Sequence, residues 1–261
     1  MQAGVSTACL YPLYVEKALE ELAVRGIQLT EVFVNSDCEI QKDFIREMKA
    51  MADTYGIQIG SLHPYTCGLE PMMFFTPYER RYNDALKYYR KYFEAMNILG
   101  AEIFVFHGNK PTNPCSDEQY FERFAGLARL GRFFGITVAQ ENVSRCMGGR
   151  LSFLKSMADH LGDEAAFVLD VKQAVRAGED IFACIETLGK RIVHVHFSDH
   201  GKNGDCLPFG QGDMDTARFF SMLNTLGYTG NVILELYRSN YGTYDELAIN
   251  YNCLKEAMQA Y

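Results

Sequence analysis

The chain has 261 residues, of which 48% are hydrophobic and 22% are charged. This is ordinary globular composition, which excludes wholesale disorder, and the length suits one large α/β domain or two small ones. The formal net charge of −8 and the isoelectric point near 5.3 argue against a nucleic-acid partner, because such proteins usually carry a basic surplus.

Nothing in the sequence indicates export or insertion into a membrane. The apolar runs are far shorter than the roughly 20 residues of a membrane span, and no signal peptide is visible after Met1. The eight cysteines are spread along the chain without a C-x-x-C pair, so we expect them to be reduced. We therefore expect a cytoplasmic protein with no membrane partner.

Strand and helix patterns alternate from one end of the chain to the other. Apolar residues recur at helical spacing in residues 14–25, which end at Gly26, and short β-branched or aromatic runs separate such segments. The expected strands are 4–10, 30–35, 57–62, 102–106, 136–140, 166–169, 191–197 and 232–236. The helices expected after them are 14–25, 39–55, 77–99, 116–134, 151–161, 180–188, 216–226 and 244–260.

Eight consecutive strand–helix units in about 250 residues are what a closed (β/α)8 barrel requires. No linker, charge block or low-complexity segment divides the chain, so residues 1–261 are predicted to form a single TIM-barrel domain. The main rival is a doubly wound open sheet. For a nucleotide, that fold would carry a Gly-rich first turn, and the turn Ala8-Cys9-Leu10-Tyr11-Pro12 has none.

Polar side chains follow the apolar run of six predicted strands. Active sites of such barrels form at the carboxyl ends of the strands. Side chains two residues apart on a strand share a face, so these groups converge if they point into the mouth of the barrel. The six residues are His63, His107, Glu141, Asp170, His196 and Glu235.

Three carboxylates and one imidazole in a ring would be a poor arrangement without a cation, because the carboxylates repel each other. One nitrogen with several oxygen donors suits a divalent ion and leaves positions for substrate oxygens. Each residue alone could instead be a cap, as at Asp170, or a satisfied interior residue. The ring predicted to hold one metal ion comprises Glu141, Asp170, His196 and Glu235.

The chain resembles the xylose isomerase-like TIM-barrel superfamily, in particular its sugar phosphate isomerase/epimerase group. The matching segments are 140–142 (Gln-Glu-Asn), 169–173 (Leu-Asp-Val-Lys-Gln), 193–199 (Val-His-Val-His-Phe-Ser-Asp), 208–215 (Pro-Phe-Gly-Gln-Gly-Asp-Met-Asp) and 234–236 (Leu-Glu-Leu). The resemblance implies that the same four residues bind one divalent metal, with Mn²⁺ expected and Mg²⁺, Co²⁺ or Zn²⁺ as alternatives. It also implies that Glu141 and Glu235 act as the acid and the base.

This chemistry suits the isomerisation or epimerisation of a small sugar or sugar derivative through a metal-stabilised enediolate. His63 and His107 are expected to orient substrate hydroxyls or Glu141, while Lys172 and Arg145 lie just past strand ends and could bind the substrate. The resemblance departs at Gln173, where family members often have a histidine. An amide there can still hydrogen-bond a sugar hydroxyl but cannot carry a proton.

Three other functions stay open at this point. A lyase of the inosose dehydratase kind would use the same metal site, and a non-catalytic barrel would only bind a sugar. An abasic-site nuclease of the endonuclease IV type is disfavoured by Gln173, by the acidic charge, and by residues 204–208, which lack that family's Asp-x-His. Barrels of this group often pair, so a homodimer or homotetramer is an expectation from the resemblance alone.

Overall fold

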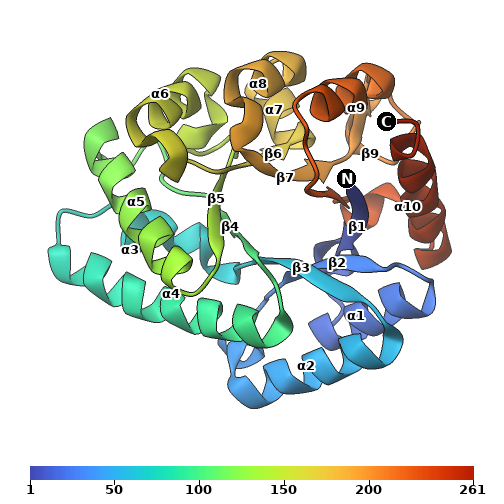
Figure 1. Cartoon of the computed structure of the whole chain (residues 1–261), viewed down its shortest axis with the longest axis horizontal. Coiled ribbons are helices and arrows are strands. Elements are labelled where there is room, and N and C mark those ends of the chain that lie inside the picture. The colour runs from blue at the N-terminus through green and yellow to red at the C-terminus, as the bar shows by residue number, and fades with distance from the viewer.

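The computed structural model describes residues 1–261 and forms a closed barrel of parallel strands surrounded by helices (Figure 1). Around the barrel the strands run in the order β1-β10-β7-β6-β5-β4-β3-β2. The predicted single (β/α)8 TIM barrel is confirmed. Its strands are β1 (Gln2–Ser6), β2 (Leu29–Phe33), β3 (Gln58–His63), β4 (Ile103–Phe106), β5 (Thr137–Glu141), β6 (Phe167–Asp170), β7 (Ile192–Phe197) and β10 (Asn231–Leu234).

A ring of helices covers the outside of the barrel (Figure 1). None of them combines the length and the apolar character needed to cross a bilayer. The helices that follow the eight strands are α1 (Val15–Val24), α2 (Lys42–Tyr55), α4 (Glu79–Leu99), α5 (Asp117–Phe133), α6 (Leu151–Leu161), α8 (Ile181–Leu188), α9 (Thr216–Thr225) and α10 (Tyr244–Met258).

The structure differs from the predicted elements in four places. The first strand was predicted to reach Leu10, but β1 ends at Ser6, whose side chain accepts a hydrogen bond from Ala8 N and starts a 3-10 turn. Two short helices inside loops were not predicted, and neither was an antiparallel hairpin beyond β7. These elements are α3 (Glu70–Met73), α7 (Val171–Ala177), β8 (Asp199–Gly201) and β9 (Gly204–Leu207).

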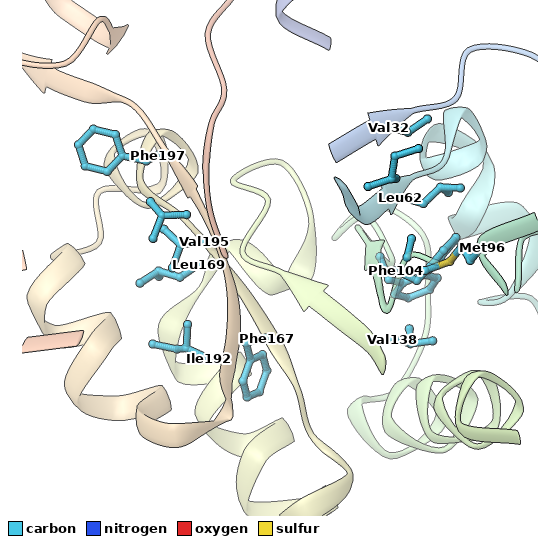
Figure 2. Packing of buried hydrophobic residues seen from close by; sticks show 14 of the residues in the cluster. Val32, Leu62, Met96, Phe104, Val138, Phe167, Leu169, Ile192, Val195 and Phe197 are labelled. Atoms are coloured by element: carbon cyan, nitrogen blue, oxygen red, sulfur yellow. The ribbon is translucent and has the colours of Figure 1, made fainter. Parts of the chain in front are cut away.

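The outer faces of the strands pack against the helices and form the main hydrophobic core. Figure 2 shows this packing in two groups, one from β2 to β5 with Met96 of α4, and one from β6 and β7. Burial of such side chains contributes most of the stability of the barrel, at about 25 cal/mol per Å² of apolar surface. The first group includes Val32, Leu62, Met96, Phe104 and Val138, and the second includes Phe167, Leu169, Ile192, Val195 and Phe197.

The side chains that point into the barrel are apolar in one layer of the strands and polar in the next layer toward their carboxyl ends. A separate small cluster of buried residues, which includes Val105, Ala139 and Val168, fills part of the barrel interior. Because side chains two positions apart share a face, the next interior residues on the same strands are His107, Glu141 and Asp170. The alternation of the strands therefore brings polar groups together at the carboxyl end of the barrel.

Candidate metal centre

Four side chains from neighbouring strands meet at the mouth of the barrel. They come from the ends of β5 and β6, from β7, and from the residue directly after β10. Each offers one ligand atom, and these atoms all lie within 4.8 Å of one another. The structure thus brings together the four residues of the predicted metal ring, which are Glu141, Asp170, His196 and Glu235.

His196 lies at the centre of this group. Its Nδ1 atom is 3.0 Å from Glu235 Oε2, 3.3 Å from Glu141 Oε1 and 3.7 Å from Asp170 Oδ2. Three carboxylate oxygens therefore face one ring nitrogen. Although burial opposes a positive charge, the carboxylates of Glu31 and Glu235 hold the pKa of His196 well above its ordinary value.

The turn after β6 orients Asp170. Its Oδ1 atom accepts a hydrogen bond of 2.8 Å from Gln173 N and caps α7. Asp170 can therefore cap the helix with one oxygen and bind a metal ion with the other. The other oxygen, Oδ2, is buried and has no hydrogen-bond partner. The side chain of Asn142 also bonds both the N–H and the C=O of Asp170, at 2.7 and 2.9 Å, and ties β5 to β6. Asp170 is thereby held with one free oxygen in the ring.

One side of the ring, which we call the histidine side, consists of His63, His107 and Glu141. His107 Nε2 lies 2.7 Å from Glu141 Oε2, and His63 Nε2 lies 2.8 Å from His107 Nε2. Burial alone would raise the pKa of Glu141, but the neighbouring histidines, led by His107, hold it well below its ordinary value. Both predicted histidines are therefore placed to orient Glu141.

The opposite side, the lysine side, consists of Asp170, Lys172 and Glu235. Lys172 Nζ lies 3.3 Å from Glu235 Oε1 and 3.5 Å from Asp170 Oδ2, and its side chain is only 4% exposed. Burial disfavours its charge, yet the two carboxylates keep the pKa of Lys172 well above its ordinary value. In return, Lys172 and His196 outweigh the burial of Glu235 and lower its pKa to about 2.

The donor set fits a divalent cation. Burial, together with the negative charges of Glu141 and Glu235, raises the pKa of Asp170, so these carboxylates are in electrostatic conflict with one another. Of the buried carboxylate oxygens, Asp170 Oδ2 has no hydrogen-bond partner, and Glu141 Oε2 has only its close approach to His107 Nε2. A cation with oxygen and imidazole ligands would neutralise this charge and satisfy these atoms.

A family model described as the xylose isomerase-like TIM barrel matches residues 17–257 of the sequence. The chain belongs to this family. An uncharacterised protein of Mycobacterium leprae is 26% identical over 92% of this chain and 90% of its own length. An inosose dehydratase of Mesomycoplasma hyopneumoniae is 27% identical over 70% of this chain and 62% of its own length.

Solved structures show the same barrel. A protein described as D-tagatose 3-epimerase-like superposes with a TM-score of 0.82 at 19% identity, over 100% of this chain and 98% of its own. IolI, solved with a bound zinc atom, gives a TM-score of 0.81 at 18% identity, over 100% and 99%. At such identities the likeness concerns the fold, which this xylose isomerase-like barrel shares in full.

Two further predicted residues lie at the edge of the site of this xylose isomerase-like barrel. The carbonyl oxygen of Gln173 accepts hydrogen bonds from Ser144 N at 3.0 Å and Ser144 Oγ at 2.8 Å, which leaves only its amide N–H groups for other contacts. Arg145 is exposed, and its charge adds to the burial that lowers the pKa of His107.

Two of the segments that carry the family resemblance, 193–199 and 208–215, meet through one aspartate. Asp199, the last residue of the first segment, accepts hydrogen bonds of 3.0 Å from both Gly210 N and Gly212 N of the second. A Cβ atom at Gly212 would lie 2.3 Å from Asp199 Oδ1, so only glycine fits there. This contact shapes the loop after β7 and does not itself reach the metal ring.

Sequence reasoning missed two buried carboxylates next to the site. Glu70 in α3 accepts hydrogen bonds from His107 N at 2.9 Å and Gly108 N at 2.5 Å, and so fastens the loop after β3 to the end of β4. Glu31 lies within β2 and contacts His196 from below. The available signal for Glu31 was a charged residue inside an otherwise strand-like run (Leu-Thr-Glu-Val-Phe).

Proposed function

We propose that this protein is a divalent-metal-dependent isomerase or epimerase of a small sugar or sugar derivative. The observation that supports it most is the convergence of three carboxylates and His196 Nδ1 at the mouth of the barrel, where the buried Asp170 Oδ2 lacks a hydrogen-bond partner. Proteins with the same fold include a D-tagatose 3-epimerase-like protein and a D-psicose 3-epimerase. A cytoplasmic role in carbohydrate metabolism accompanies this proposal.

The residues proposed to hold the metal are Glu141, Asp170, His196 and Glu235. The three carboxylates favour Mn²⁺ or Mg²⁺, whereas the imidazole also admits Zn²⁺ or Co²⁺, and we propose Mn²⁺ as the resident ion. When bound, such an ion supplies Lewis acidity toward the carbonyl and the adjacent hydroxyl oxygen of a sugar.

Glu141 and Glu235 are the proposed acid and base. They lie on either side of His196, and both keep a pKa below the ordinary value, so each is ionised near neutral pH and able to accept a proton. One glutamate takes the proton from the carbon next to the carbonyl. The C–H electron pair then forms the new C=C bond, and the carbonyl electrons move to oxygen to give the enediolate.

Return of a proton by the other glutamate completes the reaction. That proton comes from solvent, which reaches Glu235 because its side chain is 20% exposed. Return on the opposite face of the same carbon gives an epimer, and return to the neighbouring carbon gives the aldose–ketose isomer. Because this proton comes from solvent, we expect a solvent hydrogen on the carbon of the product that receives it.

The residues around the ring are the proposed substrate contacts. On the lysine side, the Lys172 ammonium can bind a substrate oxygen near Glu235, and Tyr237, whose ring is 5.1 Å from Nζ, borders it. On the histidine side, His63, His107 and Arg145 face the other end of the substrate. Gln173 contributes its amide N–H groups.

A dehydratase is the second candidate, and the inosose dehydratase relative favours it. It would begin with the same removal of a proton next to a carbonyl. The electron pair would then expel a hydroxyl group from the neighbouring carbon, which takes up a proton and leaves as water, so that no proton is returned to the carbon that lost it. The two reactions therefore differ in what happens to the substrate in heavy water.

Incubation of the Mn²⁺-loaded protein with a panel of ketoses and inososes in D₂O tests the proposal. An isomerase or epimerase would incorporate deuterium at the carbon next to the carbonyl without loss of water, as read by NMR and mass spectrometry. A product lighter by one water would establish the dehydratase. The His196→Ala variant is the control for adventitious metal chemistry, and the absence of turnover with every substrate would contradict both candidates.

A further inference from the structure

The interior layer directly below the metal ring is polar on one side and apolar on the other. We define this lower layer as the interior residues two positions before the mouth residues of their strands. Beneath His107, Glu141 and Asp170 it contains the small apolar residues Val105, Ala139 and Val168. On the side of His196 and His63 it contains Glu31, Ser61 and His194, all fully buried.

Glu31 connects the polar residues of this layer. One of its oxygens, Oε2, lies 2.9 Å from Ser61 Oγ, 3.1 Å from His194 Nε2 and 3.2 Å from His196 Nε2. Ser61 is its direct partner in the β2–β3 register, whereas both histidines belong to β7, three strands away around the barrel. Glu31 therefore reaches across the interior to β7.

A carboxylate at this depth is costly unless it is hydrogen-bonded, and an apolar side chain would fill the space at less cost. The apolar half of the same layer shows that the barrel closes well without charge below Glu141 and Asp170. The difference lies in the ligand above. A carboxylate ligand has no ring nitrogen that faces the lower layer, whereas His196 has one.

The two nitrogens of His196 face different surroundings. Nε2 faces Glu31, and Nδ1 faces the oxygens of Glu141, Asp170 and Glu235. An ionised carboxylate only accepts hydrogen bonds, so Nε2 must carry a hydrogen to bond Glu31. When Nδ1 loses its own proton to become a metal ligand, its lone pair points to where the carboxylate ring converges.

We propose that Glu31 is a positioning residue that fixes the ring of His196 with its hydrogen on Nε2, so that Nδ1 is presented to the divalent cation. Ser61 and His194 complete the hydrogen bonds of the same Glu31 oxygen. Neither of them contacts an atom of the metal ring through its other polar atoms, and His194 Nδ1 has no partner at all. This inference rests on the proposed metal site but not on the reaction or the substrate.

The affinity of the metal-free protein for Zn²⁺, measured by competition with a chromophoric chelator, tests the proposal. Glu31→Leu removes the acceptor and should weaken binding by about 10–100-fold, the usual effect of losing a hydrogen-bond partner of a metal ligand. Glu31→Gln keeps one acceptor oxygen and should lose less than about tenfold. The matched control Ser61→Ala removes a different contact of the same oxygen and should stay within about threefold.

Long-range ¹H–¹⁵N NMR of the histidine rings reads the hydrogen position directly, with His196→Ala for assignment. The Zn²⁺-loaded wild type should show the hydrogen of His196 on Nε2 and the metal on Nδ1. A hydrogen on Nδ1, or no Zn²⁺ binding by the wild type, would overturn the inference, as would unchanged affinity in a Glu31→Leu variant that circular dichroism shows to be folded. If that variant does not fold, Glu31→Gln and the wild-type spectrum decide the question. Zn²⁺ binding with the expected spectrum but without turnover would refute only the proposed reaction.

Discussion

The histidine side and the lysine side of the metal ring place a glutamate in different surroundings. Glu141 has only 3% of its side chain exposed, and its Oε2 atom lies 2.7 Å from His107 Nε2 and 3.9 Å from His63 Nε2. Glu235 is 20% exposed and lies beside the Lys172 ammonium. Both surroundings keep the carboxylate ionised, the first through neighbouring imidazoles and the second through a fixed positive charge.

The difference indicates how two chemically identical residues can perform different steps. A glutamate closed off from water keeps the proton that it has taken, and a glutamate open to water exchanges it. We therefore expect Glu235 to be the site where solvent hydrogen enters and Glu141 to be shielded from exchange. Substitutions on the two sides should then have distinguishable effects.

Replacement of either glutamate by glutamine should have the largest effect. Glutamine has the same size but cannot take a proton, and loss of a general base typically costs about 10²- to 10⁴-fold in turnover. Steady-state rates with the ketose identified in the substrate panel measure this loss for Glu141→Gln and Glu235→Gln. Activity near that of the wild type in either variant would remove that glutamate from the acid–base pair.

Rescue by a small acid sharpens the comparison. Formate should restore part of the activity of Glu235→Ala, because this side chain borders solvent, and should not rescue Glu141→Ala, which is enclosed. The initial rate is measured over a series of formate concentrations, with sodium chloride as the ionic-strength control. Equal rescue of the two variants would show that both sides are open to water.

Removal of the Lys172 charge should have an intermediate effect. In Lys172→Met the carboxylates of Asp170 and Glu235 lose a neighbouring cation and attract a divalent ion more strongly, so Mn²⁺ affinity should rise by about 3–10-fold. Turnover should fall because a substrate contact is lost. Calorimetric titration of the metal-free protein gives the affinity, and Lys172→Arg, which keeps the charge, is the control. A weaker affinity in Lys172→Met would contradict this electrostatic account.

The pH dependence of stability should differ between the wild type and a Glu235 variant in the absence of metal. Folding lowers the pKa of Glu235 from 4.5 to about 2, so its ionised form stabilises the native state above pH 4.5. This contribution is lost as the pH falls from about 4.5 to about 2. Urea unfolding in EDTA at several pH values should show a shallower loss for Glu235→Gln than for the wild type in this window. Parallel curves would contradict the lowered pKa.

Replacement of Gln173, at the rim of the barrel, should have the smallest effect on turnover. Gln173 bonds Ser144 twice and so links the loop after β5 to α7. Gln173→Ala should lower the free energy of unfolding by about 1–2 kcal/mol, measured by urea denaturation, and change turnover by a few-fold. A loss of turnover as large as that of Glu235→Gln would instead give Gln173 a direct part in the reaction.

The sequence was sufficient to predict the barrel and the convergence of the four proposed metal ligands at its mouth, for one physical reason. Parallel strands of a barrel end at the same rim, and a polar residue in phase with interior positions, such as Glu141 after Ala139, must face the mouth. The alternation of side chains along each strand therefore indicates which residues face the mouth of the barrel. The same logic did not give the boundary of β1, because the Ser6 side chain ends the strand inside an apolar stretch.

The buried supporting residues could not be predicted in the same way. Glu70 lies in the short helix of the loop after β3. Its carboxylate accepts hydrogen bonds from the backbone N–H groups of His107 and Gly108, which are 37 and 38 residues further along the chain. Glu31 depends on histidines more than 160 residues along the chain. The helix α7 is a different case, since Asp170 as its cap and Gly178 in the left-handed conformation as its stop were visible local signals.

The location of a bound metal ion tests the central claim most directly. A crystal of the wild-type protein soaked with Mn²⁺ and measured near the manganese absorption edge gives an anomalous difference map that identifies the ion without reference to activity. We predict one strong peak coordinated by Glu141, Asp170, His196 Nδ1 and Glu235. A peak elsewhere, or a mouth that remains without anomalous density at saturating Mn²⁺, would contradict the account.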